Sequence, residues 1–266
     1  HRRRHSFPTR RSSDLYFIPL AIVSALAVLW QSHRVLPLID WTYAFENAYR
    51  FSLGATPYSE VGMPLTPGTF KLLGILFSSF GVSSVVFLIY SILHQIAFLG
   101  VSLSILLALQ IPMATSLVLT TALLFTQQVM FPMPHYDCDA ILTALISIRL
   151  LFAIKPTTNT KIIVLAGVFA GLPFVFKQNI GIANILICMT WTTWYWIKKS
   201  RNIRALAMYI VTAMLPAIAL LIWVFVKGGS TGLASMWFWL VEFAAATKSD
   251  SLQRVISDFT STPALL

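Results

Sequence analysis

The chain has 266 residues, of which 57% are hydrophobic and 11% charged, and its mean hydropathy is +0.78. A soluble domain carries about 25% charged residues, so a soluble globular fold is excluded and an all-α, multi-pass membrane protein is predicted. The net charge of +10 does not indicate a nucleic-acid partner, because residues 1–15 alone contain five arginines and one aspartate, a net +4, which leaves +6 for the rest.

Residues 1–15 have no apolar period and resemble translated sequencing-adaptor DNA. We interpret them as a non-native artefact and exclude them from fold reasoning; the alternative is a signal-peptide n-region or a basic anchor. Residues 16–266 then form one transmembrane domain, which we expect to be truncated at both ends. Two cysteines, Cys138 and Cys188, do not support a disulfide framework and are expected to be inert.

Apolar segments predict about seven transmembrane helices, at residues 16–31, 82–109, 114–131, 140–153, 162–176, 180–197 and 205–226. Several are shorter than the roughly 20 residues that a perpendicular helix needs to cross a bilayer. The fifth and sixth segments can therefore also form one kinked unit around Lys177.

The orientation follows from the basic residues of the short loops. The loops after the fourth and sixth segments carry Lys155, Lys161, Lys198, Lys199, Arg201 and Arg204, and both are predicted to be cytoplasmic. Counting outward puts 33–81, 132–139, the turn at Lys177 and residues from 227 onward outside. The predicted location is the cytoplasmic (inner) membrane, with the site facing outside.

The first external loop, residues 33–81, is predicted to hold two helices that lie in the membrane interface. Residues 40–53 have an apolar face and a polar face at helical spacing; Asp40 starts this helix and Gly54 ends it. A second helix over 69–80 is closed by Gly81 and is too short to span.

Asp40 is the candidate general base of this loop, because tryptophan beside it and the bilayer beneath would raise the pKa of its carboxyl. The alternative role is capping of the helix N-terminus. Glu46 and Arg50 are four apart and are predicted to form an ion pair.

Asp137 and Asp139 stand at the start of the fourth span, where carboxylates either cap the helix or serve a site. His135 is four residues before Asp139, so a metal or proton-transfer role is conceivable, but two residues are too few to assert a metal. A divalent cation therefore stays open as a cofactor.

Lys177 lies between the apolar stretches 174–176 and 180–182 and is followed by Gln178. A lysine ammonium is a compact charge suited to binding phosphate; the alternative is snorkelling to the interface. Arg50 and Lys71 are external cations that anchor at the interface, and His94 and Gln95 are interpreted as helix–helix contacts. Because the acidic clusters and Lys177 face one compartment, they predict a site for an anionic, membrane-borne substrate.

These motifs resemble those of GT-C-fold glycosyltransferases, most closely the family 39-like enzymes, the superfamily of protein O-mannosyltransferases and bacterial aminoarabinose transferases. The resemblance covers roughly residues 16–200. It is carried by Ile39-Asp40-Trp41, Ala48-Tyr49-Arg50, Gly54-Ala55-Thr56-Pro57-Tyr58, Pro67-Gly68, Phe80-Gly81, Asp139-Ala140-Ile141-Leu142-Thr143, and Ala166-Gly167-Val168-Phe169-Ala170-Gly171-Leu172 leading to Lys177.

The resemblance implies a hexosyl- or pentosyltransferase that moves a sugar, with inversion, from a polyprenyl-phosphate donor to a glycan, lipid or protein acceptor. Asp40 would be the catalytic base. Lys177 would hold the lipid phosphate, and the second-loop acid would be Asp139. The remaining candidates for substrate binding are Glu46, Arg50, Lys71, His135, Asp137 and Gln178.

Two departures weigh against specific acceptors within this superfamily. Asp40-Trp41 replaces the Asp-Glu pair of the mannosyltransferases, and Thr66-Pro67-Gly68 replaces the Lys-Pro-Pro of the aminoarabinose branch. The alternative function is a transporter or a non-catalytic membrane protein. Transporters place polar residues near the bilayer midplane on broken helices, whereas these charges are predicted to cluster at one interface.

Overall fold

The computed structural model describes residues 10–32, 38–130, 136–154, 159–200 and 202–247, and within these ranges the regular structure is helical. The helices are α1 (Arg10–Ser32), α2 (Leu38–Ser52), α3 (Gly68–Phe80), α4 (Ser84–Ala108), α5 (Met113–Met130), α6 (Tyr136–Ala153), α7 (Thr160–Gly171), α8 (Pro173–Phe176), α9 (Gln178–Tyr195) and α10 (Ile203–Trp237), with π-helical turns at Trp196–Ser200 and Phe238–Glu242.

Three helical stretches of the described chain are long and apolar enough to cross a membrane: Ser84–Ala108, Gln178–Lys198 and Ile203–Thr247. Shorter apolar helices cover Phe17–Trp30, Gly68–Phe80, Met113–Phe125 and Thr160–Phe176. This is the composition of a helical membrane protein, as the sequence predicts; the number of seven spans and their orientation stay predictions.

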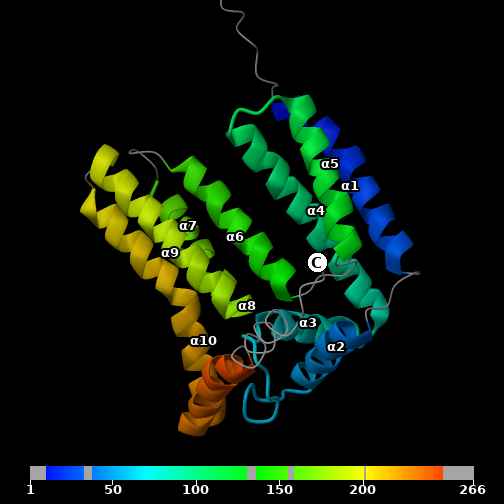
Figure 1. Cartoon of the computed structure of the whole chain (residues 1–266), viewed down its shortest axis with the longest axis vertical. Coiled ribbons are helices and arrows are strands. Elements are labelled where there is room, and N and C mark those ends of the chain that lie inside the picture. Colours follow the sequence, from blue (N-terminus) through cyan, green and yellow to red (C-terminus); the bar gives the residue numbers. More distant parts are fainter. Residues whose placement is uncertain (1–9, 33–37, 131–135, 155–158, 201, 248–266) are drawn as a thin grey trace, which may run out of the picture.

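The helices form two groups that meet at α4 and α6 (Figure 1). α1, α4 and α5 pack together around Leu99 and Leu124, while α6, α7, α9 and α10 pack around Ala170, Cys188 and Tyr209. α2 and α3 lie across one end of the bundle, the lower end in Figure 1, and pack against each other. This arrangement makes a platform of two short helices under the longer ones.

The predicted boundaries of the platform are close to those of the structure. α3 ends at Gly81, which has a φ of +88° and donates its N–H to the carbonyl of Phe77, so the predicted glycine stop is confirmed. α2 begins at Leu38, two residues before the predicted start, so Asp40 is in the first turn and is not the residue that caps the helix. An acidic residue is favourable at either position, which is why the pattern alone did not fix the start.

Two other boundaries differ from the predictions. α1 begins at Arg10, inside residues 1–15, and α6 begins at Tyr136, so that both aspartates belong to its first turn. The seventh span ends close to its predicted end: the first stretch of α10 is interrupted at Gly229, where a φ of 63° and a ψ of −156° make a kink, and a second helical stretch follows it.

The chain reverses direction at Lys177 (Figure 1). α7 and α8 run toward the platform end and α9 returns from it, so the fifth and sixth segments form a hairpin and not one kinked unit. Lys177 itself is extended, with φ −152° and ψ 117°, and precedes the first turn of α9. The hairpin therefore delivers a lysine to the same end as α2 and α3.

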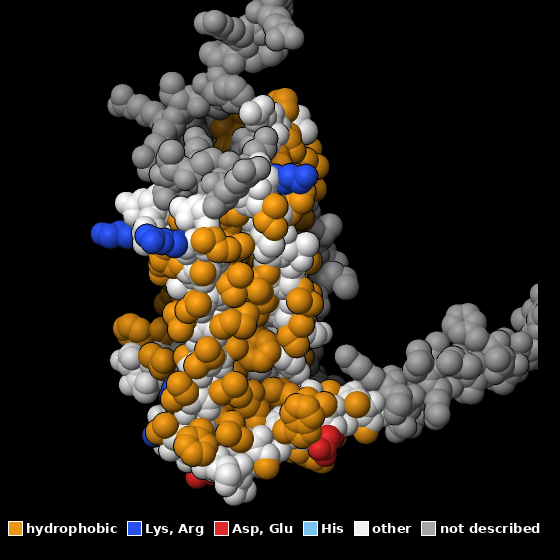
Figure 2. Space-filling view, turned by 90° about the vertical axis from the view of Figure 1, so that its left-hand side faces the viewer, with side chains coloured by type: hydrophobic (Ala, Val, Ile, Leu, Met, Phe, Trp, Pro, Cys, Tyr) orange, Lys and Arg blue, Asp and Glu red, His pale blue; other side chains and the backbone are white. Residues whose placement is uncertain are grey.

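Basic and acidic side chains lie chiefly toward opposite ends of the helix bundle. On the face seen in Figure 2, apolar side chains cover the middle, the Lys and Arg side chains lie chiefly toward the upper end, and the Asp and Glu side chains toward the lower end. An apolar band between two polar ends is the surface that a bilayer requires.

Two glycines bring α7 and α10 into close contact. A Cβ on Gly171 would lie 2.0 Å from the carbonyl oxygen of Ala213, and one on Gly167 would lie 2.0 Å from Oγ1 of Thr212. Small residues four apart let transmembrane backbones approach in this way. The contact holds the hairpin arm that leads to Lys177 against α10.

We expect Gly171→Ala to lower the free energy of unfolding by about 1–3 kcal/mol, because the new methyl group meets backbone that cannot move aside. Chemical or thermal unfolding in detergent micelles measures it. Gly100→Ala is the matched control: its Cβ would meet only the ring edge of Phe17 at 3.0 Å, which a side-chain rotation relieves. Equal losses for the two variants would contradict this account of the α7–α10 contact.

Candidate functional site

The first turn of α6 carries two carboxylates that point to different neighbours. Successive residues of an α-helix are rotated by about 100°, so Asp137 and Asp139 are about 200° apart around the axis. Asp139 is 4% exposed, whereas the side chain of Asp137 is 27% exposed. We call these two residues the acidic turn.

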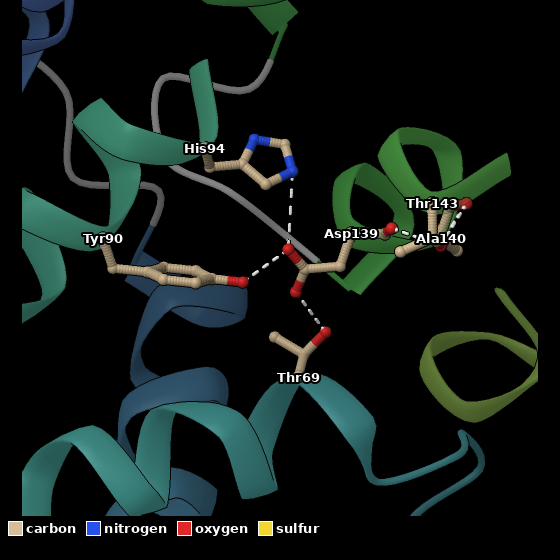
Figure 3. A network of polar contacts seen from close by, with 6 residues as sticks. All are labelled: Thr69, Tyr90, His94, Asp139, Ala140 and Thr143. Atoms are coloured by element: carbon tan, nitrogen blue, oxygen red, sulfur yellow. Dashed lines mark hydrogen bonds and ion pairs between the residues drawn. The ribbon is translucent and has the colours of Figure 1, made fainter. Parts of the chain in front are cut away.

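Asp139 is the centre of a buried polar network (Figure 3). Thr69 of α3 donates to its Oδ2 at 2.5 Å, and the hydroxyl of Tyr90 on α4 donates to its Oδ1. Nε2 of His94, one turn further along α4, lies 3.4 Å from the same Oδ1. One carboxylate thus connects α3, α4 and α6.

This network satisfies a group that is costly to bury. A carboxylate removed from water destabilises the fold unless donors compensate it, and bonds to an ionised acceptor are stronger than those between neutral groups. Within α6, the hydroxyl of Thr143 donates to the backbone carbonyl of Asp139 at 2.8 Å. Asp139 therefore fixes the platform against the bundle.

Asp137 faces the other way and pairs with Lys177. Its Oδ1 contacts the lysine ammonium, which also lies 4.9 Å from the ring centroid of Tyr136. The Lys177 side chain is 20% exposed, so the pair is half-buried at the platform end. The structure thus brings together Asp137, Asp139 and Lys177, as the sequence predicts.

Gln178 and Lys71 also lie at this end of the molecule. Nε2 of Gln178 donates to the carbonyl of Pro64 at 3.1 Å, which joins the hairpin turn to the loop before α3. Nζ of Lys71 lies 5.8 Å from the ring centroid of Trp223 on α10. Gln178 is thus a structural contact, while Lys71 borders an apolar groove.

The groove has a volume of about 530 Å³ and lies between α3, α7–α8 and α10. Its wall on α3 is one helical face, at spacings of three, four and seven residues, and Lys71 is the charged side chain of the lining. The residues of the lining are Pro67, Gly68, Lys71, Leu72, Ile75, Val168, Leu172, Val175, Phe176, Leu215, Pro216, Ala219, Leu220 and Trp223.

The groove opens on the apolar outer surface of the bundle and reaches the hairpin turn. Its lining residues Ile75 and Leu215 are 50% and 45% exposed, so its mouth is among apolar side chains. Phe176, another lining residue, directly precedes Lys177. The half-buried Lys177 is therefore the residue that follows the groove lining along the chain, and its ammonium contacts Asp137 of α6.

Glu46 and Arg50 are not part of this site. They form an ion pair with each other at 2.5 Å on the surface of α2, and their side chains are 59% and 49% exposed. The predicted ion pair between Glu46 and Arg50 is confirmed. Both side chains lie on the exposed surface of α2, apart from the acidic turn and its partner Lys177. The side chain of Asp40, in the first turn of α2, and the whole of His135 lie outside the described residues.

Tyr43, three residues after Asp40 on α2, packs edge-on against Phe70 with ring centroids 5.4 Å apart. Burial raises the pKa of Tyr43 to about 12, so at neutral pH its hydroxyl is protonated and is available only as a neutral group. Among the described residues no group of three or more His, Cys, Asp or Glu side chains is arranged to hold a metal ion.

Sequence reasoning missed three partners of the site: Thr69, Tyr90 and Tyr136. Tyr90 and His94 are four apart, so they share a face of the second predicted span, which is a signal for a polar contact in an apolar helix. Thr69 had no such signal, because a threonine in the first turn of a helix is ordinary. His94 does contact a neighbouring helix, as interpreted, and its neighbour is Asp139.

Comparison of the chain with protein-family models, with curated proteins and with solved structures finds no match. The resemblance to GT-C glycosyltransferases therefore stays a prediction that rests on the motifs.

We expect Asp139→Ala to lower the free energy of unfolding by about 2–4 kcal/mol, because it leaves the hydroxyls of Thr69 and Tyr90 without their acceptor. Chemical unfolding in micelles measures it, and limited proteolysis should show earlier cleavage beside α3. Glu46→Ala, which removes an exposed carboxylate from the platform, should cost less than about 1 kcal/mol. If the two variants were equally stable, the network would not be what holds α3.

Proposed function

We propose that the protein is an inverting glycosyltransferase, which transfers a hexosyl or pentosyl group from a polyprenyl-phosphate donor to a hydroxyl acceptor outside the cytoplasmic membrane. One observation carries the proposal: an apolar groove of about 530 Å³ opens on the apolar surface, and the half-buried Lys177 is the next residue after Phe176 of its lining. A long hydrocarbon chain with a phosphate at its end matches both features.

The groove suits an isoprenoid chain because its lining is apolar and it opens on the apolar outer surface. A polyprenyl donor diffuses in the bilayer, so its site must be entered from the apolar band and not from water. The lining from α3, α7–α8 and α10 meets this requirement. Burial of apolar surface would bind the chain without regard to its exact length.

Lys177 is assigned to the phosphate. In the transfer, the acceptor oxygen forms a bond to the anomeric carbon while the bond from that carbon to the phosphate oxygen breaks, and the electron pair leaves with the lipid phosphate. A fixed ammonium beside the phosphate stabilises this developing charge. Tyr136 beneath the ammonium helps to fix it, at 4.9 Å.

Asp40 is assigned to the acceptor. The hydroxyl must lose its proton as it attacks, and a carboxylate at the interface can accept it. Asp40 belongs to α2, which packs on α3, and α3 is held by Asp139. In this scheme Asp139 is a positioning residue, because its carboxylate is buried among protein donors.

A second candidate function is a proton-coupled transporter, favoured by the His94–Asp139 pair buried at 3.4 Å between α4 and α6. Single cysteines at 40 and 177, reacted with a membrane-impermeant reagent, separate the two candidates. Labelling from the outer side alone agrees with the transferase, while labelling from either side in turn agrees with the transporter.

We expect Asp40→Asn to lower the rate of sugar transfer by about 10²–10⁴-fold, the usual contribution of a general base, with little change in stability. Membranes that contain the protein are supplied with radiolabelled polyprenyl-phosphate sugars, and label that leaves the lipid is counted. Glu46→Gln, six residues further along the same helix, is the matched control and should keep nearly full activity. Unchanged transfer by Asp40→Asn would remove Asp40 as the base.

We expect Ala219→Trp, which fills the groove, to raise KM for a long-chain donor by about tenfold or more while kcat changes little. Steady-state kinetics with long-chain and short-chain donors measure it, and the short-chain donor should be affected less. Ala114→Trp, on an exposed position of α5 away from the groove, is the control. Equal KM values for Ala219→Trp and the unmodified protein would place the lipid elsewhere.

A further inference from the structure

The cation assigned to the phosphate already has an anionic partner within the protein. Asp137 contacts the ammonium of Lys177, and the two side chains are 27% and 20% exposed. A phosphate that approaches Lys177 would therefore meet a carboxylate at the same ammonium. Two anions on one ammonium repel each other, so the substrate and Asp137 must compete.

Asp137 can leave Lys177 without becoming an unsupported charge. It is the second residue of α6, where free backbone amides and the positive end of the helix dipole stabilise a carboxylate. Its partial exposure leaves room for a change of rotamer. Lys177 is held by its packing over Tyr136 and by its position at the hairpin turn, so the carboxylate is the partner that moves.

We propose that Asp137 is an internal counter-ion, which neutralises Lys177 in the empty site, is displaced by the phosphate of the lipid substrate, and recaptures Lys177 to release the product. The proposal rests on the proposed function of this site. It assigns Asp137 a role opposite to that of a substrate ligand: the carboxylate weakens the binding of the anionic lipid.

The charges of donor and product explain why such a competitor is useful. The donor is a phosphodiester with one negative charge, whereas the lipid phosphate that departs is a monoester with a charge of about −1.5 to −2 at neutral pH. A lone lysine would therefore bind the product more tightly than the donor. Because Asp137 is tethered beside Lys177, it lowers the affinity for both and prevents the product from remaining bound.

The test is binding of farnesyl phosphate to the purified full chain in micelles, with farnesol as the uncharged probe. We expect Asp137→Asn to bind farnesyl phosphate about threefold to tenfold more tightly than the unmodified protein, which corresponds to a partly exposed ion pair. Binding of farnesol should not change. Asp137→Ser is the second variant, since serine and asparagine both tolerate the first turn of a helix.

Two further variants make the result specific. Glu46→Gln removes the same charge from the same end of the molecule but releases Arg50 and not Lys177, so it should leave the affinity unchanged within about twofold. Lys177→Met should weaken binding of farnesyl phosphate to the level of farnesol. Thermal unfolding of each variant confirms that it is folded.

The outcomes separate this inference from the proposed function. If the unmodified protein binds farnesyl phosphate and Lys177→Met does not, but the Asp137 variants bind equally or more weakly, the counter-ion role is wrong and the phosphate site stands. Equal gains for Glu46→Gln and Asp137→Asn would also overturn it, because long-range charge alone would then explain the effect. If Lys177→Met binds as well as the unmodified protein, both proposals fail.

Discussion

A buried carboxylate in an apolar helix bundle is the constraint on which the arrangement of this protein depends. Asp139 can remain beneath the surface only if donors come to it, and they come from Thr69 on α3 and Tyr90 on α4. In hydrocarbon-like surroundings the cost of losing them is larger than in water. Together with the burial of Phe70, Leu73 and Phe77, the bond from Thr69 to Asp139 therefore sets the rotation of the short helix α3.

The platform in turn determines where the groove can form. Since Thr69 of α3 faces Asp139, the neighbouring face of the same helix, with Gly68 and Lys71, is left for α8 and α10. Gly68 permits this approach, because a Cβ there would lie 2.5 Å from the carbonyl oxygen of Val175. The groove is therefore a consequence of the same helix rotation that satisfies the buried acid.

The sequence predicted the parts of this arrangement that are local. Apolar runs placed most of the long helices within a few residues, and Gly81 ended α3 because its backbone adopts a positive φ. It also predicted that Asp137, Asp139 and Lys177 lie on one side, since the two aspartates begin one apolar segment and Lys177 stands between two others. Their proximity in the structure depends in addition on the packing of α6 against α8 and α9. The groove was not predictable, because it depends on how α3, α8 and α10 cross. Glu46 and Arg50 share that side but form an exposed ion pair on α2, whereas Lys71 lines the groove.

The two residues of the acidic turn have different roles because of their spacing on α6. At a separation of two residues they cannot share a face of α6, so one carboxylate is directed into the junction with α3 and α4 and the other toward the hairpin turn. The first is buried and accepts hydrogen bonds from Thr69 and Tyr90. The second meets a cation that is partly open to solvent, in an interaction weak enough for another anion to replace.

A separation of four residues would have put both charges at one place, where their repulsion would have favoured protonation of one of them. The sequence Asp-Cys-Asp therefore supplies, from a single helical turn, a buried carboxylate that joins three helices and a partly exposed carboxylate that contacts Lys177.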